Sequence, residues 1–225
     1  MANTETTINA VIHPQLNETP IDIEKTIKAL ERNKFVVHYF ETAAEAVSYL
    51  KKRIQNKCVA IGDSRTLSEI GVHDALSEVN EDITDIQRPL PGESFRDTAL
   101  RTMGRDVFLT SVNALSQTGE MVNIDGTGNR VAASLFGSQE VFFVLGINKI
   151  TPDLASAIHR ARNVAAPLNS KKNKKSSLNP CATLDEKCYD CGSPDRICNA
   201  LTIYYKKMRN MQTMEIIIIN ESLGF

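Results

Sequence analysis

The sequence has almost no net charge. Its 26 lysine and arginine residues nearly balance its 27 aspartate and glutamate residues, which leaves a formal net charge of -1. A chain without a strong overall field has no general attraction to nucleic acid or to an anionic membrane surface. We therefore expect neither of these among its partners.

Long apolar runs are also missing. The longest purely aliphatic run is the four isoleucines at residues 216–219, whereas a span of the bilayer needs about 18–20 residues. Residues 1–20 have neither the basic start nor the apolar centre of a secretion signal. We expect a cytoplasmic protein whose residues 1–20 form a flexible N-terminal segment.

Histidine is scarce and scattered. His13, His38, His73 and His159 show no H-x3-H spacing, so a histidine metal site is not expected. The order of residues supports no Ser–His–Asp or Cys–His catalytic arrangement either.

Apolar residues alternate between helical spacing and short strand-like runs. Helices are predicted over residues 21–32, 43–54 and 152–165, and strands over residues 35–40, 58–61, 106–112, 120–124, 140–145, 201–205 and 214–219. Pro167 is expected to end the last helix. Residues 82–103 are expected to be irregular, because prolines and a glycine follow Arg88.

This alternation predicts an α/β fold with a mostly parallel central sheet flanked by helices. We expect one domain over residues 21–225. A basic linker and a cysteine-rich insertion at residues 169–199 would interrupt it before the last two strands.

A glycine-containing loop follows the predicted strand at 120–124. Gly126, Thr127 and Gly128 would let backbone N–H groups approach an anion closely, and Asn129 and Arg130 would add side-chain donors. The alternative is an ordinary tight turn in which Arg130 pairs with a surface carboxylate.

Two carboxylates are candidate catalytic groups. Glu120 would act as a general base if its strand start faces a cleft, and the alternative is a solvated turn residue. Asp125 would orient Arg130 or bind a substrate hydroxyl, and the alternative is a cap of the turn.

Four of the five cysteines lie in one short segment. Cys181, Cys188, Cys191 and Cys198 follow the spacing C-x6-C-x2-C-x6-C. Clustered thiolates suit a Zn²⁺ ion or a [4Fe–4S] cluster. The spacing matches neither two C-x2-C knuckles nor the ferredoxin pattern, so both metals stay open, as do a reduced thiol loop and a reversible Cys188–Cys191 disulfide. Cys58 is expected to be a buried core thiol.

Several short motifs occur in the order found in one known family. They lie at residues 63–71, 110–115, 118–120, 125–130, 146–150, 180–181 and 196–199. On these motifs the chain, from about residue 21 to 225, resembles the LUD, or lactate-utilisation, domain family and is similar to lactate-utilisation protein C.

The resemblance implies a fold similar to ribose-5-phosphate isomerase, glucosamine-phosphate deaminase and coenzyme A transferases, in which loops at the carboxyl ends of strands line the ligand cleft. On it we predict the following substrate-binding residues: Ser64, Arg65, Thr66, Asn113, Gly126, Thr127, Gly128, Asn129 and Arg130. In the first loop, Asp63 stands where the family resemblance leads us to expect glycine. Its carboxylate would repel an anion unless Arg65 offsets its charge. Lactate-utilisation protein C need not carry the four-cysteine segment.

The resemblance also implies a link to the oxidation of L-lactate to pyruvate together with iron–sulfur partner subunits. We therefore expect a component of L-lactate or other 2-hydroxy-acid oxidation that binds a small organic anion. The alternatives are a transferase or isomerase acting on a phosphorylated or coenzyme A-linked metabolite, and a non-enzymatic scaffold for an iron–sulfur partner. A homo-oligomer is compatible with each.

Overall fold

The computed structural model describes residues 19–172, 178–185 and 187–225. Six parallel strands form its central sheet, in the order β1-β10-β7-β4-β2-β3. The strands are β1 (Val36–Phe40), β2 (Cys58–Ile61), β3 (Asp82–Asp85), β4 (Val107–Thr110), β7 (Glu140–Gly146) and β10 (Thr213–Ile219). The predicted α/β fold with a parallel central sheet is confirmed.

Both faces of this sheet are buried, which explains the unbroken apolar runs in its strands. In β10, Ile217 and Ile219 belong to one core with α3 (Ala43–Arg53), α4 (Arg65–Glu69) and α5 (Val72–Ser77). Ile216 and Ile218 point to the opposite core, which includes residues of α2 (Ile23–Arg32) and α7 (Asn129–Leu135). Successive strand residues face opposite sides of a sheet, so one isoleucine run serves both cores.

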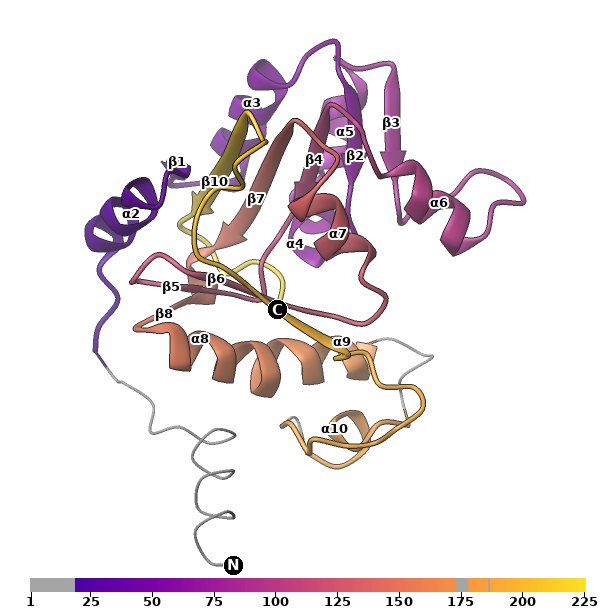
Figure 1. The fold of residues 1–225 in the computed structure, drawn as a ribbon. Helices are drawn as coiled ribbons and strands as arrows, with labels where there is room; N and C mark the ends of the chain where they lie inside the picture. The colour runs from indigo at the N-terminus through magenta and orange to yellow at the C-terminus, as the bar shows by residue number, and fades with distance from the viewer. Residues whose placement is uncertain (1–18, 173–177, 186) are drawn as a thin grey trace, which may run out of the picture.

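A second, smaller sheet lies below the first in the view of Figure 1, between it and α8. Its order is β8-β5-β6-β9, and its strands are β5 (Ala114–Ser116), β6 (Met121–Asp125), β8 (Ile150–Thr151) and β9 (Ala200–Tyr204). β6 pairs with β5 and β9 in antiparallel fashion. Sequence patterns did not predict this sheet as a separate unit, because strands of two or three residues are too short to show a period.

The segment at residues 82–103 is more regular than expected. It contains β3 and the helix α6 (Phe95–Arg101). Ser94 begins α6, because its hydroxyl accepts a hydrogen bond from the Asp97 N–H while the Asp97 carboxylate accepts from the Ser94 N–H. This capping box stabilises a helix start and outweighs the nearby prolines.

The prediction that Pro167 ends a helix is wrong. The helix α8 (Leu154–Arg160) continues through a π-helical stretch (Ala161–Ala165) into α9 (Ala166–Lys172), and Pro167 is the second residue of α9. The π-helical stretch lies directly before the proline, and there the Ala166 N–H bonds to the Ala161 carbonyl five residues back; such a local change in the hydrogen-bond ladder is a known way for a helix to accommodate an irregularity. The short helix α10 (Pro180–Thr183) then packs on α9, below it in Figure 1.

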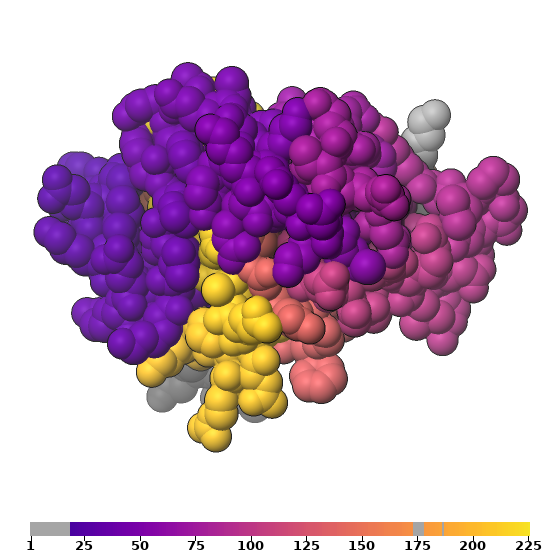
Figure 2. Space-filling model, turned by 90° about the horizontal axis from the view of Figure 1, so that it is seen from above, coloured from indigo at the N-terminus to yellow at the C-terminus, as the bar shows by residue number. Residues whose placement is uncertain are grey.

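Parallel pairing brings the carboxyl ends of β2, β4, β7 and β10 to one edge of the central sheet. A 3₁₀ turn (Ile147–Lys149) follows β7 there. Gly146 is needed beside this turn, since a Cβ atom would overlap the backbone of residues 221–223. The C-terminal part of the chain, yellow in Figure 2, reaches the surface beside the purple N-terminal part. No helix in the described ranges is long and apolar enough to cross a membrane.

Two buried carboxylates lie side by side at the other end of the sheet. Glu140 starts β7 and Glu215 pairs with Phe142 of that strand, and their side chains are only 7% and 3% exposed. Arg53 of α3 contacts both, with Nε donating to Glu215 Oε1 at 3.0 Å. One guanidinium therefore compensates two buried negative charges.

We expect Arg53→Met to lower the free energy of unfolding by about 3 kcal/mol, because it leaves two buried carboxylates without their shared cation. Urea denaturation measures this change. Arg88→Gln is the control, since Arg88 pairs with Asp74 at an exposed position and its loss should leave stability nearly unchanged. Equal stability of the two variants would contradict the role of Arg53 in compensating the two buried carboxylates.

Candidate functional site

A cavity of about 640 Å³ lies where the carboxyl ends of the strands meet. Most of the predicted substrate-binding residues line it, together with the candidate acid Asp125: Ser64, Arg65, Asn113, Asp125, Gly126, Thr127, Asn129 and Arg130. They come from the loops after β2, β4 and β6. The cavity thus joins loops from the central sheet and from the second sheet.

Three of the predicted residues do not line this cavity. Thr66 lies behind the wall, where it contacts Lys149. Gly128 begins α7 with a φ of 84°, a conformation that glycine adopts without strain. Glu120 lies in the turn between β5 and β6, where it accepts a hydrogen bond from the Thr118 hydroxyl. The structure therefore favours the turn interpretation of Glu120 over a general base.

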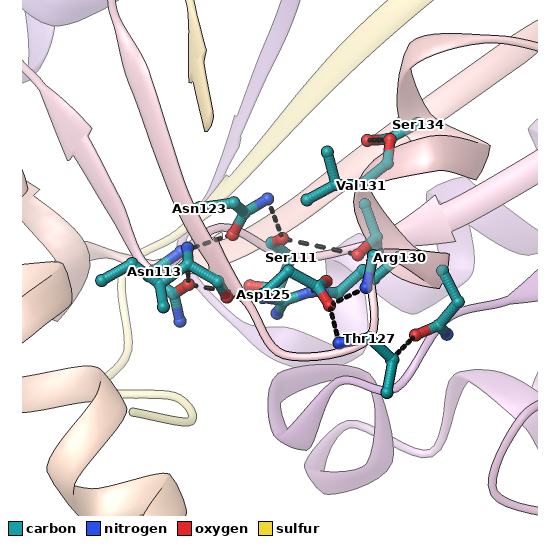
Figure 3. A network of polar contacts seen from close by, with 12 residues as sticks. Ser111, Asn113, Asn123, Asp125, Thr127, Arg130, Val131 and Ser134 are labelled. Atoms are coloured by element: carbon teal, nitrogen blue, oxygen red, sulfur yellow. Dashed lines mark hydrogen bonds and ion pairs between the residues drawn. The ribbon is translucent and has the colours of Figure 1, made fainter. Parts of the chain in front are cut away.

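Asp125 holds the glycine loop in shape. Its Oδ1 accepts hydrogen bonds from the Thr127 N–H at 3.1 Å and the Gly128 N–H at 2.8 Å, and its Oδ2 accepts from Arg130 Nε at 3.3 Å (Figure 3). The loop N–H groups that were expected to bind an anion are thus already satisfied by a carboxylate. α7 is also short, at seven residues. Anion binding at this loop has to come from side chains.

Arg130 is the side chain placed for that role. Its Nη2 donates to the Ile124 carbonyl at 2.6 Å and to Asn113 Oδ1 at 3.3 Å, while Nε binds Asp125. Nη1 has no acceptor within the described ranges, and the side chain is 15% exposed. The guanidinium is therefore fixed on one edge and leaves a donor for a ligand in the cavity.

Asn113 links the loop after β4 to β6. Its Oδ1 accepts from the Ile124 N–H at 2.7 Å, and its own N–H donates to Asn123 Oδ1 at 3.0 Å. Figure 3 shows these asparagines beside Asp125 and Arg130. Asn113 therefore positions Arg130 through its amide oxygen, while its Nδ2 group is left as a donor at the cavity wall.

Lys149 is the residue that sequence reasoning missed. It follows β7, lines the cavity and is only 4% exposed. Its Nζ donates to Thr66 Oγ1 at 2.9 Å, Ser111 Oγ at 3.0 Å and the Val112 carbonyl at 3.2 Å. A lysine directly after a fully buried strand is a weak sequence signal, and it was visible in the motif at residues 146–150.

A second, partly buried cation lies close by. Arg160 of α8 donates through Nε to the Asn148 carbonyl at 3.0 Å and through Nη1 to the Asn113 carbonyl. Burial lowers the pKa of Arg160 to about 10. Burial, and then the charges of Arg160 and Arg130, lower the pKa of Lys149 to about 7. All five acceptors of Lys149 and Arg160 are neutral, being two hydroxyls and three carbonyls.

The first loop is bound mainly to its own neighbours. Ser64 caps α4 by accepting from the Leu67 N–H at 3.3 Å. Arg65 pairs with Glu69 at 2.6 Å. The Asp63 carboxylate accepts from Gln87 Nε2 at 2.7 Å, so Arg65 is not used to offset Asp63.

The four clustered cysteines do not line the cavity, and arginine side chains lie beside them. Arg162 Nη2 lies 3.6 Å from Cys188 Sγ, and Arg196 Nε lies 3.2 Å from Cys198 Sγ. Burial raises the pKa of the Cys198 thiol; the thiols of Cys188 and Cys191 act in the same direction, against the charge of Arg196. Three of the four thiols therefore lie in one neighbourhood beside two guanidinium groups.

These thiols do not form a ready metal centre. In the described ranges, which include all five cysteines, no three side chains of His, Cys, Asp or Glu are placed to hold one metal ion. All five cysteines are free thiols. The residues as arranged thus do not fit Zn²⁺ or a [4Fe–4S] cluster, and metal binding by Cys181, Cys188, Cys191 and Cys198 stays a prediction from their spacing.

The cysteine segment is nevertheless attached to the glycine loop. Ile197 lines the cavity, and a Cβ atom on Gly126 would lie 3.0 Å from the Ile197 carbonyl oxygen. Asn199 donates through its N–H to the Asp125 carbonyl at 3.0 Å and through Nδ2 to the Gly126 carbonyl at 2.9 Å. Glycine at position 126 allows this close packing.

Comparison with known protein families identifies the family of this chain, and comparison with solved structures supports its fold. The family model described as the LUD domain matches residues 23–219. No curated protein matches the chain. A crystal structure of a DUF162 family protein from Deinococcus radiodurans is similar in fold, with a TM-score of 0.52 at 13% sequence identity, over 89% of this chain and 99% of that one.

Variants of Asp125 separate its two structural roles. Asp125→Ala removes the acceptor of two loop N–H groups and the partner of Arg130, so we expect a loss of about 2–4 kcal/mol in the free energy of unfolding. Asp125→Asn keeps an oxygen for the N–H groups and should lose less. Urea denaturation compares them with Asp63→Ala, an exposed control expected to change little. Equal losses for the Ala and Asn variants would show that the loop hydrogen bonds contribute nothing.

Proposed function

The chain belongs to the LUD domain family, and from that premise we propose that its cavity binds a small 2-hydroxy or 2-oxo carboxylate. In this proposal the protein is a component of 2-hydroxy-acid utilisation, with L-lactate and pyruvate as the representative ligands. Arg130 binds the carboxylate through Nη1, and Lys149 contacts the oxygen on the neighbouring carbon.

The observation that carries this proposal is the group of cations at the cavity, one buried and two partly buried, with neutral hydrogen-bond partners. Within the described residues, Lys149 and Arg160 hydrogen-bond only to hydroxyls and carbonyls, and the one carboxylate contacting Arg130 also serves the loop N–H groups. Burying charge without a counter-charge is costly. A bound anion would offset that cost, which supports an anionic ligand for this cavity.

Oxidation of a 2-hydroxy acid transfers two electrons to an acceptor. An iron–sulfur partner subunit takes that role in this proposal, as the family resemblance implies. The residues of this chain would hold the acid, orient its hydroxyl-bearing carbon and exchange a proton at Lys149 Nζ. Its pKa of about 7 suits a group that gains and loses a proton near neutral pH.

A larger ligand is the second candidate, and the size of the cavity favours it. A volume of about 640 Å³ is in the range of pockets for much larger ligands than a three-carbon acid. Arg65 and Lys172 also line the cavity and would suit phosphate groups. A phosphorylated or coenzyme A-linked metabolite would therefore occupy the same space.

Titration calorimetry with L-lactate tests the proposal. We expect Arg130→Gln and Lys149→Met each to weaken binding by about tenfold, which corresponds to the loss of one charge-assisted hydrogen bond. Lys28→Met, at an exposed pair with Glu24, is the control and should bind like the wild type. Wild-type affinity in both cavity variants would refute this site.

The pH dependence gives a second check. Below its pKa of about 7 Lys149 is an ammonium that attracts the ligand, and above that pH it is neutral. We therefore expect the L-lactate affinity of the wild type to fall as pH rises through 7, with a weaker trend in Lys149→Met. Binding of a phosphorylated or coenzyme A-linked compound, with none of L-lactate or pyruvate, would favour the second candidate.

A further inference from the structure

We propose that Lys149 is a nucleophile whose amine forms a reversible imine with the carbonyl carbon of a 2-oxo acid held in the cavity. The proposal rests on the proposed function, because it assumes that such an acid binds beside Arg130. It goes further by assigning covalent chemistry to one named atom, Lys149 Nζ.

The position of the amine is fixed by the backbone around it. Lys149 ends the 3₁₀ turn after β7. Asn148 Oδ1 accepts from the Leu223 N–H at 3.1 Å, which ties this turn to the C-terminal segment. Gly224 packs so closely on the other side that a Cβ atom would lie 3.2 Å from Lys149 Nζ. An amine held in this way loses little freedom when it reacts.

The partners of the amine suit both of its protonation states. Thr66 and Ser111 contribute hydroxyls, which can accept a hydrogen bond from the ammonium or donate one to the neutral amine. A carboxylate in their place would hold Lys149 in the charged form. The two hydroxyls therefore leave the amine a lone pair to use at neutral pH.

The neighbouring cations act in the same direction. Arg160 and Arg130 both disfavour the ammonium form, against a smaller opposing effect of the Glu69 carboxylate, and Lys149 lines the cavity directly. Desolvation and a neighbouring cation are the general means by which a lysine becomes a nucleophile. A purely structural buried lysine would instead be expected to have an anionic partner.

The reaction is balanced without any oxidant. Arg130 Nη1 holds the carboxylate, and the neutral Nζ attacks the carbonyl carbon to give a carbinolamine. The carbonyl oxygen then leaves as water, having received the two protons that the amine gave up, and a C=N bond replaces the C=O bond. The Ser111 and Thr66 hydroxyls lie within 3.0 Å of Nζ and would pass these protons.

Reductive trapping tests this inference. The full chain is incubated with pyruvate and sodium cyanoborohydride, and its intact mass is measured. We expect one adduct whose added mass equals that of pyruvic acid less one oxygen atom, and peptide mapping should place it on Lys149. Incubation with L-lactate, which has no carbonyl carbon to attack, should give no adduct.

Variants make the assignment specific. Lys149→Met should lose the adduct, and Lys28→Met should keep it. Ser111→Ala keeps the amine and removes one hydroxyl, so it should be trapped more slowly while still binding pyruvate. The trapping rate of the wild type should rise with pH through about 7, opposite to the trend expected for L-lactate affinity, because trapping needs the neutral amine.

The outcomes separate this inference from the proposed function. Calorimetric binding of pyruvate without an adduct would overturn the inference and leave the proposed function intact. An adduct that persists in Lys149→Met would also overturn it, since the reacting lysine would lie elsewhere. Failure of both pyruvate and L-lactate to bind would refute the proposed function and the inference together.

Discussion

The burial of cations without a buried counter-charge is the constraint on which this site depends. Lys149 and Arg160 are held by hydroxyls and backbone carbonyls, which satisfy their hydrogen bonds but carry no negative charge, and the Glu69 carboxylate offsets the charge of Lys149 only in part. The fold can maintain them because parallel strands end at a common edge, where the backbone carbonyls after β4 and β7 are free to accept. The lowered pKa of Lys149 reduces part of this positive charge near neutral pH. A bound anionic ligand would compensate the rest.

Asp125 has the complementary role. It is the carboxylate nearest to Arg130, yet it is divided between the guanidinium and two loop N–H groups. This division fixes the loop and the orientation of Arg130 while leaving one guanidinium nitrogen for a ligand. Asp125 therefore orients Arg130 and also caps the turn, so in the proposed site it would act on a ligand only through that arginine.

Much of the central sheet could be predicted because its signals are local. The four-isoleucine run of β10 and the run in β7 are long enough to show a fully buried strand.

Other features depend on tertiary contacts and could not be predicted. The prediction that Pro167 ends a helix failed because the helix passes through a π-helical stretch before the proline. Such a stretch is a tertiary feature that helix propensities do not describe. The choice between a general base and a turn residue at Glu120 could not be made from the sequence, because its position depends on the pairing of β5 with β6. Lys149 was missed because its significance comes from Thr66, Ser111 and Arg160, which are far from it in sequence.

The surroundings of the clustered cysteines also depend on residues that are distant in sequence. Its spacing suggested a metal centre, whereas the side chains found against the sulfurs of Cys188 and Cys198 are arginines from α8's continuation and from the segment itself. Guanidinium donors stabilise thiolate charge, so they suit a nucleophilic thiol as well as a metal ligand. The contacts connect the cysteine segment to the glycine loop, because Ile197 packs against Gly126 and Asn199 donates a hydrogen bond to the Gly126 carbonyl. Chemistry at these thiols that shifts residues 197–199 would therefore also shift Gly126 and, through Asp125, the arginine at the cavity wall.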